Sequence, residues 1–444
     1  MNALIVDMTH GGKLIALQFL KLDDFNVFAL DIYNTLSESE KHSLEKKRIK
    51  FVEKSFLDEL NNDDFLIIAP VHCSIGSKVD MTHHEVVKFL MKDQINVPII
   101  EVTGVKGKTS TVKMLAEIFK DLNPLILSSL GVEVIENGET TLLKKDISIT
   151  PASIIEAWQL AKDYKNIGIC IFETSLGGTG LADAGIITNI AENYPIASGE
   201  KTASQAKAQI FKSSVVACDF DSFNHFYSDF YKNTNTFGSN DANVNASNIK
   251  FRLDETSFTA EVNDLKTVEG DIINTKFDIS TFAPAEHHLN NILSAVCAAL
   301  ILKTPINQIK EGLRNFRGIS GRTSIRNYRG SKIIEEVNPG LNVTAIKKSV
   351  KMIMHLESPI VIFGGKYGIT CEEIDEEAVA GFFNDMNPKI QLILVDELGK
   401  NIANMLKRKY KYTDFNNAID KAAEMNSKMI LLIYRSNFSD LARR

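Results

Sequence analysis

Short apolar runs separated by amphipathic segments fill the first hundred residues of the chain. Three of these runs, Asn2–Asp7, Asn26–Ile32 and Phe65–Pro70, are apolar without alternating between apolar and polar positions. Alternation is typical of a strand with one solvated face, whereas a continuous run is typical of a strand buried on both faces. The pattern therefore predicts three buried parallel strands with helices between them.

The same order of apolar runs and helical segments continues to the end of the chain, which predicts an α/β fold throughout. We expect three domains without a long linker, at residues 1–96, 97–321 and 322–444. The second and third units add these strand candidates: Val97–Val102, Ile167–Thr174, Ala184–Ile190, Ser214–Phe220, Lys332–Val337, Pro359–Gly365, Ile390–Glu397 and Lys428–Tyr434.

The end of the second unit departs from this pattern. An Asn- and Ser-rich stretch at Ser239–Asn248 predicts a loop, and the more alternating stretch Phe251–Ile279 predicts strands. The apolar segment His287–Leu302 then predicts a helix.

Composition narrows the class of protein. The chain has 444 residues, 44% hydrophobic and 24% charged, and a net charge of −6, so it offers no basic surface for nucleic acid. No apolar run reaches the roughly 18–20 residues that cross a bilayer, and the start lacks the pattern of a signal peptide. Five scattered cysteines without metal-ligand spacing indicate reduced thiols in a cytoplasmic protein: Cys73, Cys170, Cys218, Cys297 and Cys371.

A loop rich in glycine and lysine follows the strand candidate Val97–Val102. It reads Gly104-Val105-Lys106-Gly107-Lys108-Thr109, with two residues where the usual nucleotide-binding loop has four. The residues after it form one apolar stripe at helical spacing: Val112, Leu115, Phe119 and Leu122. A strand, a glycine turn and a helix N-terminus together favour an anion, so we expect ATP phosphates here.

Two charged residues further along are candidates for the chemistry. Glu173 ends an apolar strand, where a carboxylate is costly without a cation, and Mg²⁺ shared with Thr109 would supply one. Lys207 precedes Ile210 and Phe211 on a predicted helix. A solvated helix lysine is the default interpretation of that residue.

Polar loops follow the three N-terminal strands, at Met8–Lys13, Asp31–Thr35 and Pro70–Cys73. Ligands bind at the carboxyl ends of parallel strands, so the loops indicate a binding crevice or, equally, solvent-facing turns. The side chains considered for substrate are those of Thr9, His10, Lys13, His72, His83 and His84.

The segment Thr82–Glu85 favours a helix capping box over a ligand role. His72 and Cys73 with His83 and His84 match no standard zinc spacing.

Taken together, these motifs resemble those of the Mur ligase superfamily. This superfamily comprises the ATP-dependent ligases of peptidoglycan precursors together with the folylpolyglutamate synthases. The family's shortened loop, T-G-x-x-G-K-[ST]-[ST], matches Thr103–Ser110, and its magnesium-binding glutamate matches Glu173. Its Ala-Lys segment matches Ala206-Lys207, where the lysine of many members is carbamylated and helps to hold a second Mg²⁺.

Three further segments resemble the family's nucleotide contacts. His287 and Asn291 match its H-N-x-x-N segment on the adenine side, with His288 in place of the first asparagine. Gly321-Arg322 resembles the hinge whose arginine contacts ATP phosphates, and Glu336, or less favourably Glu335, would be an acidic ATP contact.

The resemblance implies a set of site residues and an architecture. The expected catalytic residues are Lys108, Glu173, Lys207 and Arg322, and Mg²⁺ would be held by Thr109, Glu173 and Lys207. ATP would be bound by Gly104, Val105, Lys106, Gly107, Lys108, Thr109, Ser110, Asn291, Arg322 and Glu336. The architecture would be a Rossmann-like N-terminal domain, a central P-loop ATPase domain and a Rossmann-like C-terminal domain.

The chain departs from the family after the Thr-Asn strand. Asn193-Tyr194 stands where the family has Asp-His, and that histidine normally binds the second Mg²⁺. The departure leaves one or two magnesium ions open, with Glu192 as another ligand. We include Asn193 and Tyr194 among the substrate candidates.

One subgroup of the superfamily, the coenzyme F-430 synthases of methanogenic archaea, resembles the chain more than the peptidoglycan enzymes do. The similar segments are Thr9–Lys13, Asp31–Thr35, Pro70–Cys73, Ser175–Gly199 and Glu335–Val343. This resemblance implies a nickel-containing tetrapyrrole acid as substrate, whose propionate becomes an acyl phosphate and closes a carbocyclic ketone ring. We expect a monomer or homodimer that binds neither nucleic acid nor membrane.

Three alternatives remain. An amide ligase of the Mur or folylpolyglutamate type would keep the mechanism and join an amino acid to a carboxylate. A dinucleotide-dependent oxidoreductase is suggested by Asp31 at a strand end, but the loop at Gly11-Gly12 lacks a G-x-G-x-x-G. A catalytically idle relative is suggested by Tyr194.

Overall fold

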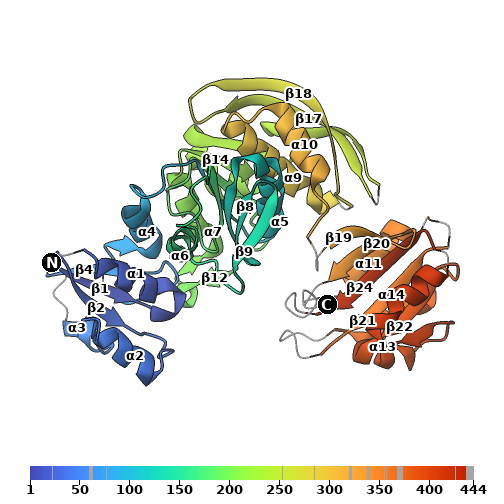
Figure 1. Ribbon diagram of the computed structural model, residues 1–444, viewed down its shortest axis with the longest axis horizontal. Coiled ribbons are helices and arrows are strands. Elements are labelled where there is room, and N and C mark those ends of the chain that lie inside the picture. Colours follow the sequence, from blue (N-terminus) through green and yellow to red (C-terminus); the bar gives the residue numbers. More distant parts are fainter. Residues whose placement is uncertain are drawn as a thin grey trace. The chain divides into compact units, whose positions relative to one another are not determined.

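The computed structural model describes most of the chain as two compact units (Figure 1). The first unit comprises Met1–Ile249, Ser257–Ser280 and His287–Asn315, and the second comprises Lys250–Thr256, Thr281–Glu286 and Phe316–Arg444. The described residues are 1–22, 24–59, 64–76, 78–252, 254–284, 286–319, 323–337, 341–354, 356, 358–367, 374–425 and 427–436.

The N-terminal sheet is wholly parallel, as the absence of alternation predicted. Its order is β3 (Lys50–Phe51), β2 (Asn26–Leu30), β1 (Asn2–Val6), β4 (Phe65–Ala69) and β5 (Met81–Thr82). The helices of this region are α1 (Lys13–Phe19), α2 (Glu38–Glu45), α3 (Phe56–Glu59) and α4 (His83–Met91), and a π-turn, η1 (Met8–Gly12), precedes α1. Buried side chains cover both faces of the sheet.

A second sheet of eleven strands runs through the rest of the first unit. Its parallel centre is β14 (Val215–Asp219), β11 (Ala184–Ile187), β6 (Ile99–Thr103), β10 (Ile169–Glu173) and β7 (Pro124–Ser128). The strands β8 (Gly131–Glu136) and β9 (Glu139–Lys144) extend one side in antiparallel fashion. The other side continues through β15 (Thr234–Phe237), β16 (Val244–Lys250), β17 (Thr256–Lys266) and β18 (Ile272–Thr281).

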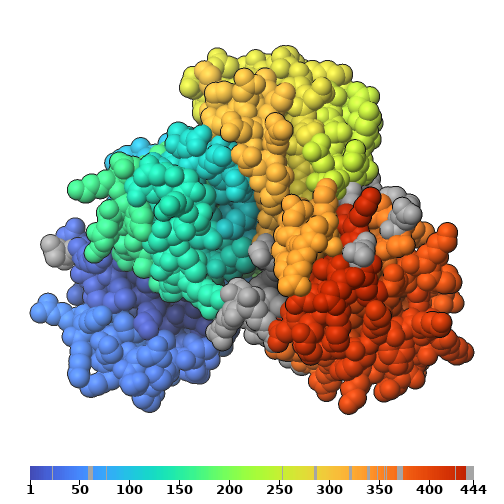
Figure 2. All heavy atoms as spheres, turned by 45° about the vertical axis from the view of Figure 1, so that its right-hand side comes forward, coloured from blue at the N-terminus to red at the C-terminus, as the bar shows by residue number. Residues whose placement is uncertain are grey.

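The helices around this sheet include α5, which begins directly after the loop that follows β6. Their bounds are α5 (Lys108–Ile118), α6 (Ser153–Leu160), α7 (Ala203–Lys207), α8 (Phe220–Ser222), α9 (Glu286–Ile301) and α10 (Ile306–Asn315). A two-stranded ribbon, β12 (Pro195–Ile196) and β13 (Lys201–Thr202), precedes α7. Figure 1 shows α6 of this region next to the N-terminal helices, and Figure 2 shows the blue and teal parts of the first unit as spheres.

The second unit holds a six-stranded sheet. Its order is β19 (Thr323–Tyr328), β20 (Ser331–Val337), β24 (Met429–Arg435), β21 (Ile360–Gly365), β22 (Gln391–Val395) and β23 (Lys411–Thr413). Only the β19–β20 pair among these described strands is antiparallel. Apolar clusters lie on both faces of the sheet, as in a Rossmann-like layer structure. The helices are α11 (Val343–Ile353), α12 (Glu376–Asp385), α13 (Asp396–Ala403) and α14 (Phe415–Glu424).

Two local predictions were wrong. The helix after the glycine loop ends at Ile118, and Leu122 is 43% exposed, because the chain tightens into a 3₁₀ turn and then passes through a left-handed residue, Asn123. The stretch Ser239–Asn248 is not all loop, because β16 begins at Val244 and pairs with β15.

Other predictions concern the cysteines, the membrane and the domain limits. Cys73, Cys170, Cys218 and Cys297 are buried free thiols, as predicted, while Cys371 lies outside the described residues. Among the described helices none is long and apolar enough to cross a membrane. The domain limits at 96/97 and 321/322 stay a prediction.

Candidate active site

The loop between β6 and α5 depends on two glycines with backbone angles that other residues rarely adopt. Gly104 has φ 137° and Gly107 has φ 88°. A Cβ on Gly104 would lie 2.0 Å from Thr188 Oγ1, and a Cβ on Gly107 would lie 2.1 Å from Asn291 Oδ1. The loop therefore packs closely against Thr188 and Asn291, and any side chain at either glycine would displace it.

Residues at the end of β11 hold the middle of the loop. The Thr188 hydroxyl donates to the Lys106 carbonyl at 2.6 Å, and Asn189 Nδ2 donates to the same oxygen at 3.0 Å. In return, the Lys106 amide donates to Asn189 Oδ1 at 3.2 Å and the Val105 amide donates to the Asn189 carbonyl at 2.9 Å. The loop conformation is thus fixed by protein contacts, and α5 starts at its end, where the N-cap residue Gly107 makes no side-chain capping bond and the positive end of the helix dipole favours an anion.

The first turn of α5 meets the end of β10. The Thr109 hydroxyl lies 3.2 Å from Glu173 Oε1, and the Ser129 amide donates to Glu173 Oε2 at 3.0 Å. Thr109 and Glu173 are both buried. A buried hydroxyl and a buried carboxylate at the start of a phosphate-binding helix are oxygen ligands of the kind that Mg²⁺ prefers.

Two lysines lie near this pair. Lys108 Nζ donates to the Gly104 carbonyl at 3.2 Å, across the loop. Lys207, at the end of α7, is 1% exposed, and its ammonium contacts the Ser175 carbonyl. Burial, with a smaller contribution from the positive charge of Lys108, lowers the pKa of Lys207 to about 7. Lys207 is therefore a buried lysine and not the solvated helix residue of the default interpretation, and near neutral pH it has a substantial uncharged fraction.

The remaining predicted nucleotide contacts are distributed over both units. Asn291, on α9, is buried against Gly107. Arg322 and the His287 side chain lie outside the described residues. On β20, Glu335 accepts from Arg326 Nε at 2.7 Å and from the Ser324 hydroxyl at 3.1 Å. Burial raises the pKa of Glu336 to about 7, although a hydrogen bond with Thr323 opposes this.

The segment between β11 and β12 contains two positions that differ from the family pattern. Asn193 Oδ1 accepts from the Ser204 amide at 2.9 Å, at the start of the helix that carries Lys207. The Tyr194 side chain is 37% exposed. The structure therefore gives Asn193 a role in positioning α7, in addition to its predicted place near the substrate.

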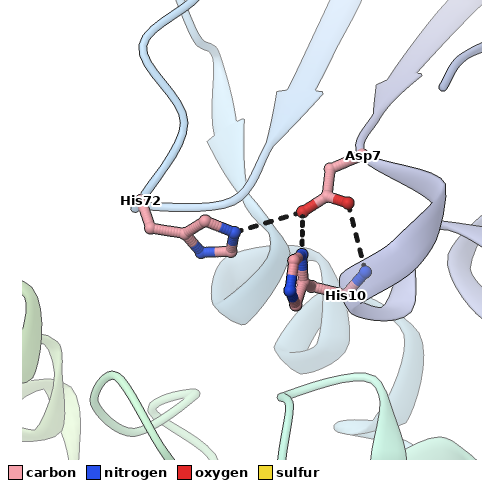
Figure 3. A group of neighbouring side chains, drawn as sticks. All are labelled: Asp7, His10 and His72. Atoms are coloured by element: carbon pink, nitrogen blue, oxygen red, sulfur yellow. Dashed lines mark hydrogen bonds and ion pairs between the residues drawn. The ribbon is translucent and has the colours of Figure 1, made fainter. Parts of the chain in front are cut away.

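The N-terminal loops bring together three residues, of which the sequence analysis missed one (Figure 3). Asp7, which directly follows β1, is fully buried, and its Oδ2 lies 2.7 Å from His10 Nδ1 and 3.2 Å from His72 Nε2. Its Oδ1 accepts from the amides of Thr9 and His10. Burial would raise the pKa of Asp7, but the hydrogen bonds from His72 and His10 outweigh it and hold the pKa below its usual value. An acidic residue directly after a buried strand was the signal that could have identified Asp7.

Two other N-terminal candidates, Lys13 and Thr9, bond to residues of the N-terminal region. Lys13 Nζ lies 3.1 Å from Glu40 Oε1, and the Thr9 and Thr35 hydroxyls are 2.5 Å apart. Thr82 caps α4 with a complete capping box to Glu85, as predicted.

A cavity of about 210 Å³ lies within the first unit, next to these loops. It is lined by His10, Pro70, His72, His83, His84, Thr150, Pro151, Ser175 and Leu176. His83 and His84 are buried in its wall, and burial lowers their pKa values to about 4 and about 3. The group of described residues with metal-ligand geometry is Asp7, His10 and His72, which is not the set of His72, Cys73, His83 and His84 considered from the sequence.

Contacts beside the cavity join the N-terminal helix α4 to the segment that follows Lys207. Thr82 Oγ1 lies 3.0 Å from Gln209 Oε1, and Gln209 Nε2 lies 3.3 Å from His84 Nδ1. Lys212 Nζ lies 2.7 Å from Glu85 Oε1. The cavity wall also includes Ser175, the residue whose carbonyl contacts Lys207. The cavity and the buried lysine therefore share one residue.

The chain is similar to known proteins over most of its length. Residues 102–299 match the family model of the Mur ligase middle domain, and residues 325–437 match that of the coenzyme F430 synthetase CfbE, C-terminal domain. The crystal structure of MurF from Acinetobacter baumannii superposes with a TM-score of 0.57 at 17% identity, covering 85% of each chain. The chain therefore matches the Mur ligase superfamily over its middle region, and its fold is the three-domain α/β architecture of these ligases, as predicted.

Within that superfamily, two curated relatives are similar over nearly the whole chain. The coenzyme F(430) synthetase of Methanocaldococcus jannaschii is 29% identical over 421 residues, which cover 92% of this chain and 93% of the relative. That of Methanosarcina acetivorans is 28% identical over 429 residues, covering 88% and 89%. The predicted similarity to the coenzyme F-430 subgroup is confirmed.

Proposed function

We propose that the protein is an ATP-dependent ligase of coenzyme F-430 biosynthesis that acts in the cytoplasm on a nickel seco-tetrapyrrole acid. The observation that supports a phosphoryl-transfer site most directly is the contact between the Thr109 hydroxyl and Glu173 at the N-terminus of α5. The two full-length relatives, both coenzyme F(430) synthetases, support the substrate class.

The residues of this site fit ATP and Mg²⁺. The close packing of Gly104 and Gly107 leaves backbone amides, not side chains, beside the helix N-terminus. Thr109 and Glu173 would hold Mg²⁺, and Asn291 would lie toward the adenine side. Bound together, ATP and Mg²⁺ supply the phosphoryl group and neutralise part of its charge.

The protein's own residues would act mainly by position and charge. Lys108 would offset the charge of the transferred group, and Arg322 would add a second cation. Lys207, uncharged in part near neutral pH, can react with carbon dioxide to give a carbamate, which is an additional oxygen ligand for a metal. These roles need no covalent enzyme intermediate.

The proposed reaction has two steps. A propionate carboxylate oxygen of the substrate takes up the terminal phosphoryl group, so that ADP leaves and an acyl phosphate forms. A neighbouring carbon of the substrate, which loses a proton, then bonds to the acyl carbon, and phosphate leaves with the carbon–oxygen bond electrons. The product is a cyclic ketone, and the substrate has lost the elements of one water molecule.

The direct experiment is to incubate the protein with ATP, Mg²⁺ and nickel seco-tetrapyrrole acid and to record the mass of the tetrapyrrole. We expect loss of one water together with release of one phosphate, and neither change when ATP is replaced by a non-hydrolysable analogue. An unchanged mass with authentic substrate would contradict the proposed reaction. ATP hydrolysis stimulated by glutamate or another amino acid would instead support an amide ligase of the Mur or folylpolyglutamate type.

A further inference from the structure

The triad of Asp7, His10 and His72 has the arrangement that proteins use to present an imidazole to a metal. We infer that His10 is an axial ligand to the nickel of the bound tetrapyrrole, with Asp7 as its positioning residue. The inference rests on the proposed substrate class and adds a specific contact to it. In metal sites, a ligating histidine commonly donates its other ring N–H to a carboxylate, which fixes the tautomer and the ring orientation.

The hydrogen bonds of Asp7 define which nitrogen of each ring is free to bind. Asp7 Oδ2 accepts from His10 Nδ1 at 2.7 Å, and a carboxylate acceptor places the proton on Nδ1. The lone pair of the neutral ring is then on Nε2, on the opposite edge. Because two backbone amides hold Oδ1 of the same carboxylate, the acceptor that orients His10 is itself fixed.

Access favours the outer ring nitrogen over the carboxylate as the metal ligand. Asp7 is 0% exposed, so a metal at Oδ2 would have to reach a buried oxygen that already receives two imidazole donors. The His10 side chain is 46% exposed and that of His72 is 22% exposed. His10 has both the shorter bond to Asp7 and the more accessible ring, so it is assigned as the ligand.

His72 and Tyr33 hold the His10 ring in one orientation. The rings of His10 and His72 meet edge to face at 4.8 Å with an interplanar angle of 86°, and those of His10 and Tyr33 meet at 5.7 Å and 88°. Edge-to-face contacts on the ring restrict its rotation. The imidazole is therefore arranged before any ligand binds, which reduces the entropy lost on ligation.

The adjoining cavity is large enough for one side chain of the tetrapyrrole but too small for the whole macrocycle, which would stay outside the cavity. Its volume of about 210 Å³ is below the roughly 300–1,000 Å³ of pockets that enclose whole ligands. It extends from His10 and His72 to Ser175, whose carbonyl contacts Lys207. A carboxylate side chain of the macrocycle in this cavity would point toward Lys207 while the nickel stays at His10. The buried His84 Nε2 has no hydrogen-bond partner among the described residues and would be available to that carboxylate.

Nickel offers a spectroscopic measure of this contact. Imidazole is a favourable ligand for nickel, and a four-coordinate square-planar Ni²⁺ centre prefers nitrogen ligands in its plane. Such a centre is diamagnetic, whereas addition of axial ligands gives a paramagnetic centre with a different absorption spectrum. Ligation by His10 can thus be followed without turnover.

The experiment is to titrate the whole protein, without ATP, with nickel seco-tetrapyrrole acid and to record absorption and magnetic circular dichroism. We expect wild type to give the paramagnetic signature of an axial ligand. His72→Ala should give the same signature with weaker affinity for the macrocycle. The control His42→Ala, which removes an exposed histidine of α2, should behave as wild type. His10→Ala should lose the signature, and added imidazole should restore it, which a merely unfolded variant would not show. The metal-free macrocycle should bind wild type and His10→Ala with affinities equal within about twofold.

Several outcomes would overturn the inference. One is an unchanged nickel spectrum on binding to wild type, and another is a signature that survives His10→Ala and is lost in His72→Ala. Tight stoichiometric binding of Ni²⁺ alone, lost in Asp7→Asn, would show an ion site instead. If the macrocycle binds and loses water without the signature, the axial contact fails and the proposed function stands; if neither form of the macrocycle binds, both fail.

Discussion

Thr109 Oγ1 lies 3.2 Å from Glu173 Oε1, which brings the first turn of α5 against the last residue of β10. These two residues are 64 positions apart in the chain, and the parallel pairing of β6 with β10 places them together. If they hold Mg²⁺, removal of the hydroxyl in Thr109→Val should weaken the apparent Mg²⁺ affinity by at least about tenfold, since even indirect metal partners contribute 10- to 100-fold.

Thr109→Ser is the matched control for this prediction, because it keeps the hydroxyl and removes a methyl group. The measurement is phosphate release as a function of Mg²⁺ concentration at saturating ATP. Equal Mg²⁺ dependence in Thr109→Val and wild type would contradict the assignment of this pair.

Replacement of Lys108 tests the phosphate-binding role of the loop. We expect Lys108→Ala to lower kcat by about 10²- to 10³-fold or more, the cost of losing one fixed transition-state contact. Its circular dichroism spectrum should match that of wild type, since the Lys108 ammonium donates to a carbonyl of the loop itself, that of Gly104, and not to a helix or strand of the core. Lys120→Ala, in the turn after α5, is the control and should turn over normally; retained activity in Lys108→Ala would refute the ATP-binding assignment.

The buried ammonium of Lys207 predicts a pH dependence of stability. Its pKa is lowered from 10.5 to about 7 in the folded protein, so between these values the unfolded chain carries a proton that the folded chain does not. Stability therefore rises with pH through this window, and the penalty of burying the charge is fully present below about pH 7.

Within the window, each unit of pH changes the unfolding free energy by about 1.4 kcal/mol for a single group. We expect the unfolding free energy to rise by roughly 2 kcal/mol between about pH 7 and pH 9. The measurement compares urea unfolding of wild type and Lys207→Met in buffer free of carbon dioxide, which prevents carbamate formation. The unfolding free energy of wild type, relative to that of Lys207→Met, should increase as the pH rises through this window. A difference independent of pH would show that Lys207 is not neutralised by burial.

The adjacent residues Glu335 and Glu336 on β20 allow a matched test of the predicted acidic contact to ATP. Glu335 is already engaged by Arg326, whereas Glu336 is half-buried beside Thr323 and has a raised pKa. We expect Glu336→Gln to raise the KM for ATP about tenfold, the value of one hydrogen bond to a charged group. Glu335→Gln should leave that KM unchanged; the reverse order would transfer the ATP contact to Glu335.

The fold could be predicted largely because each buried parallel strand is a continuous apolar run. Asn2–Val6, Asn26–Leu30 and Phe65–Ala69 all form strands where the pattern placed them. The end of α5 could not be predicted from its apolar stripe, because Leu122 keeps the helical spacing while the backbone has already left the helix. Periodicity describes which side chains share a face, and it contains no information on where a local turn interrupts that face.

The candidate site was predictable where one short motif contains the chemistry, and less so where the tertiary fold creates it. The loop and Glu173 were recognised by residue type and position. Asp7 was missed because its role depends on two histidines, of which His72 is 65 positions away. The depressed pKa of Lys207 likewise depends on burial against the Ser175 carbonyl, which the sequence does not show.

That carbonyl has one more consequence. Ser175 lines the cavity, contacts Lys207 and receives the Thr103 hydroxyl at 3.4 Å, directly before the glycine loop. A guest that moves Ser175 by a fraction of an ångström would change the environment of the amine and of the loop together. One backbone carbonyl thus joins the cavity wall, the buried amine of Lys207 and the strand that precedes the glycine loop.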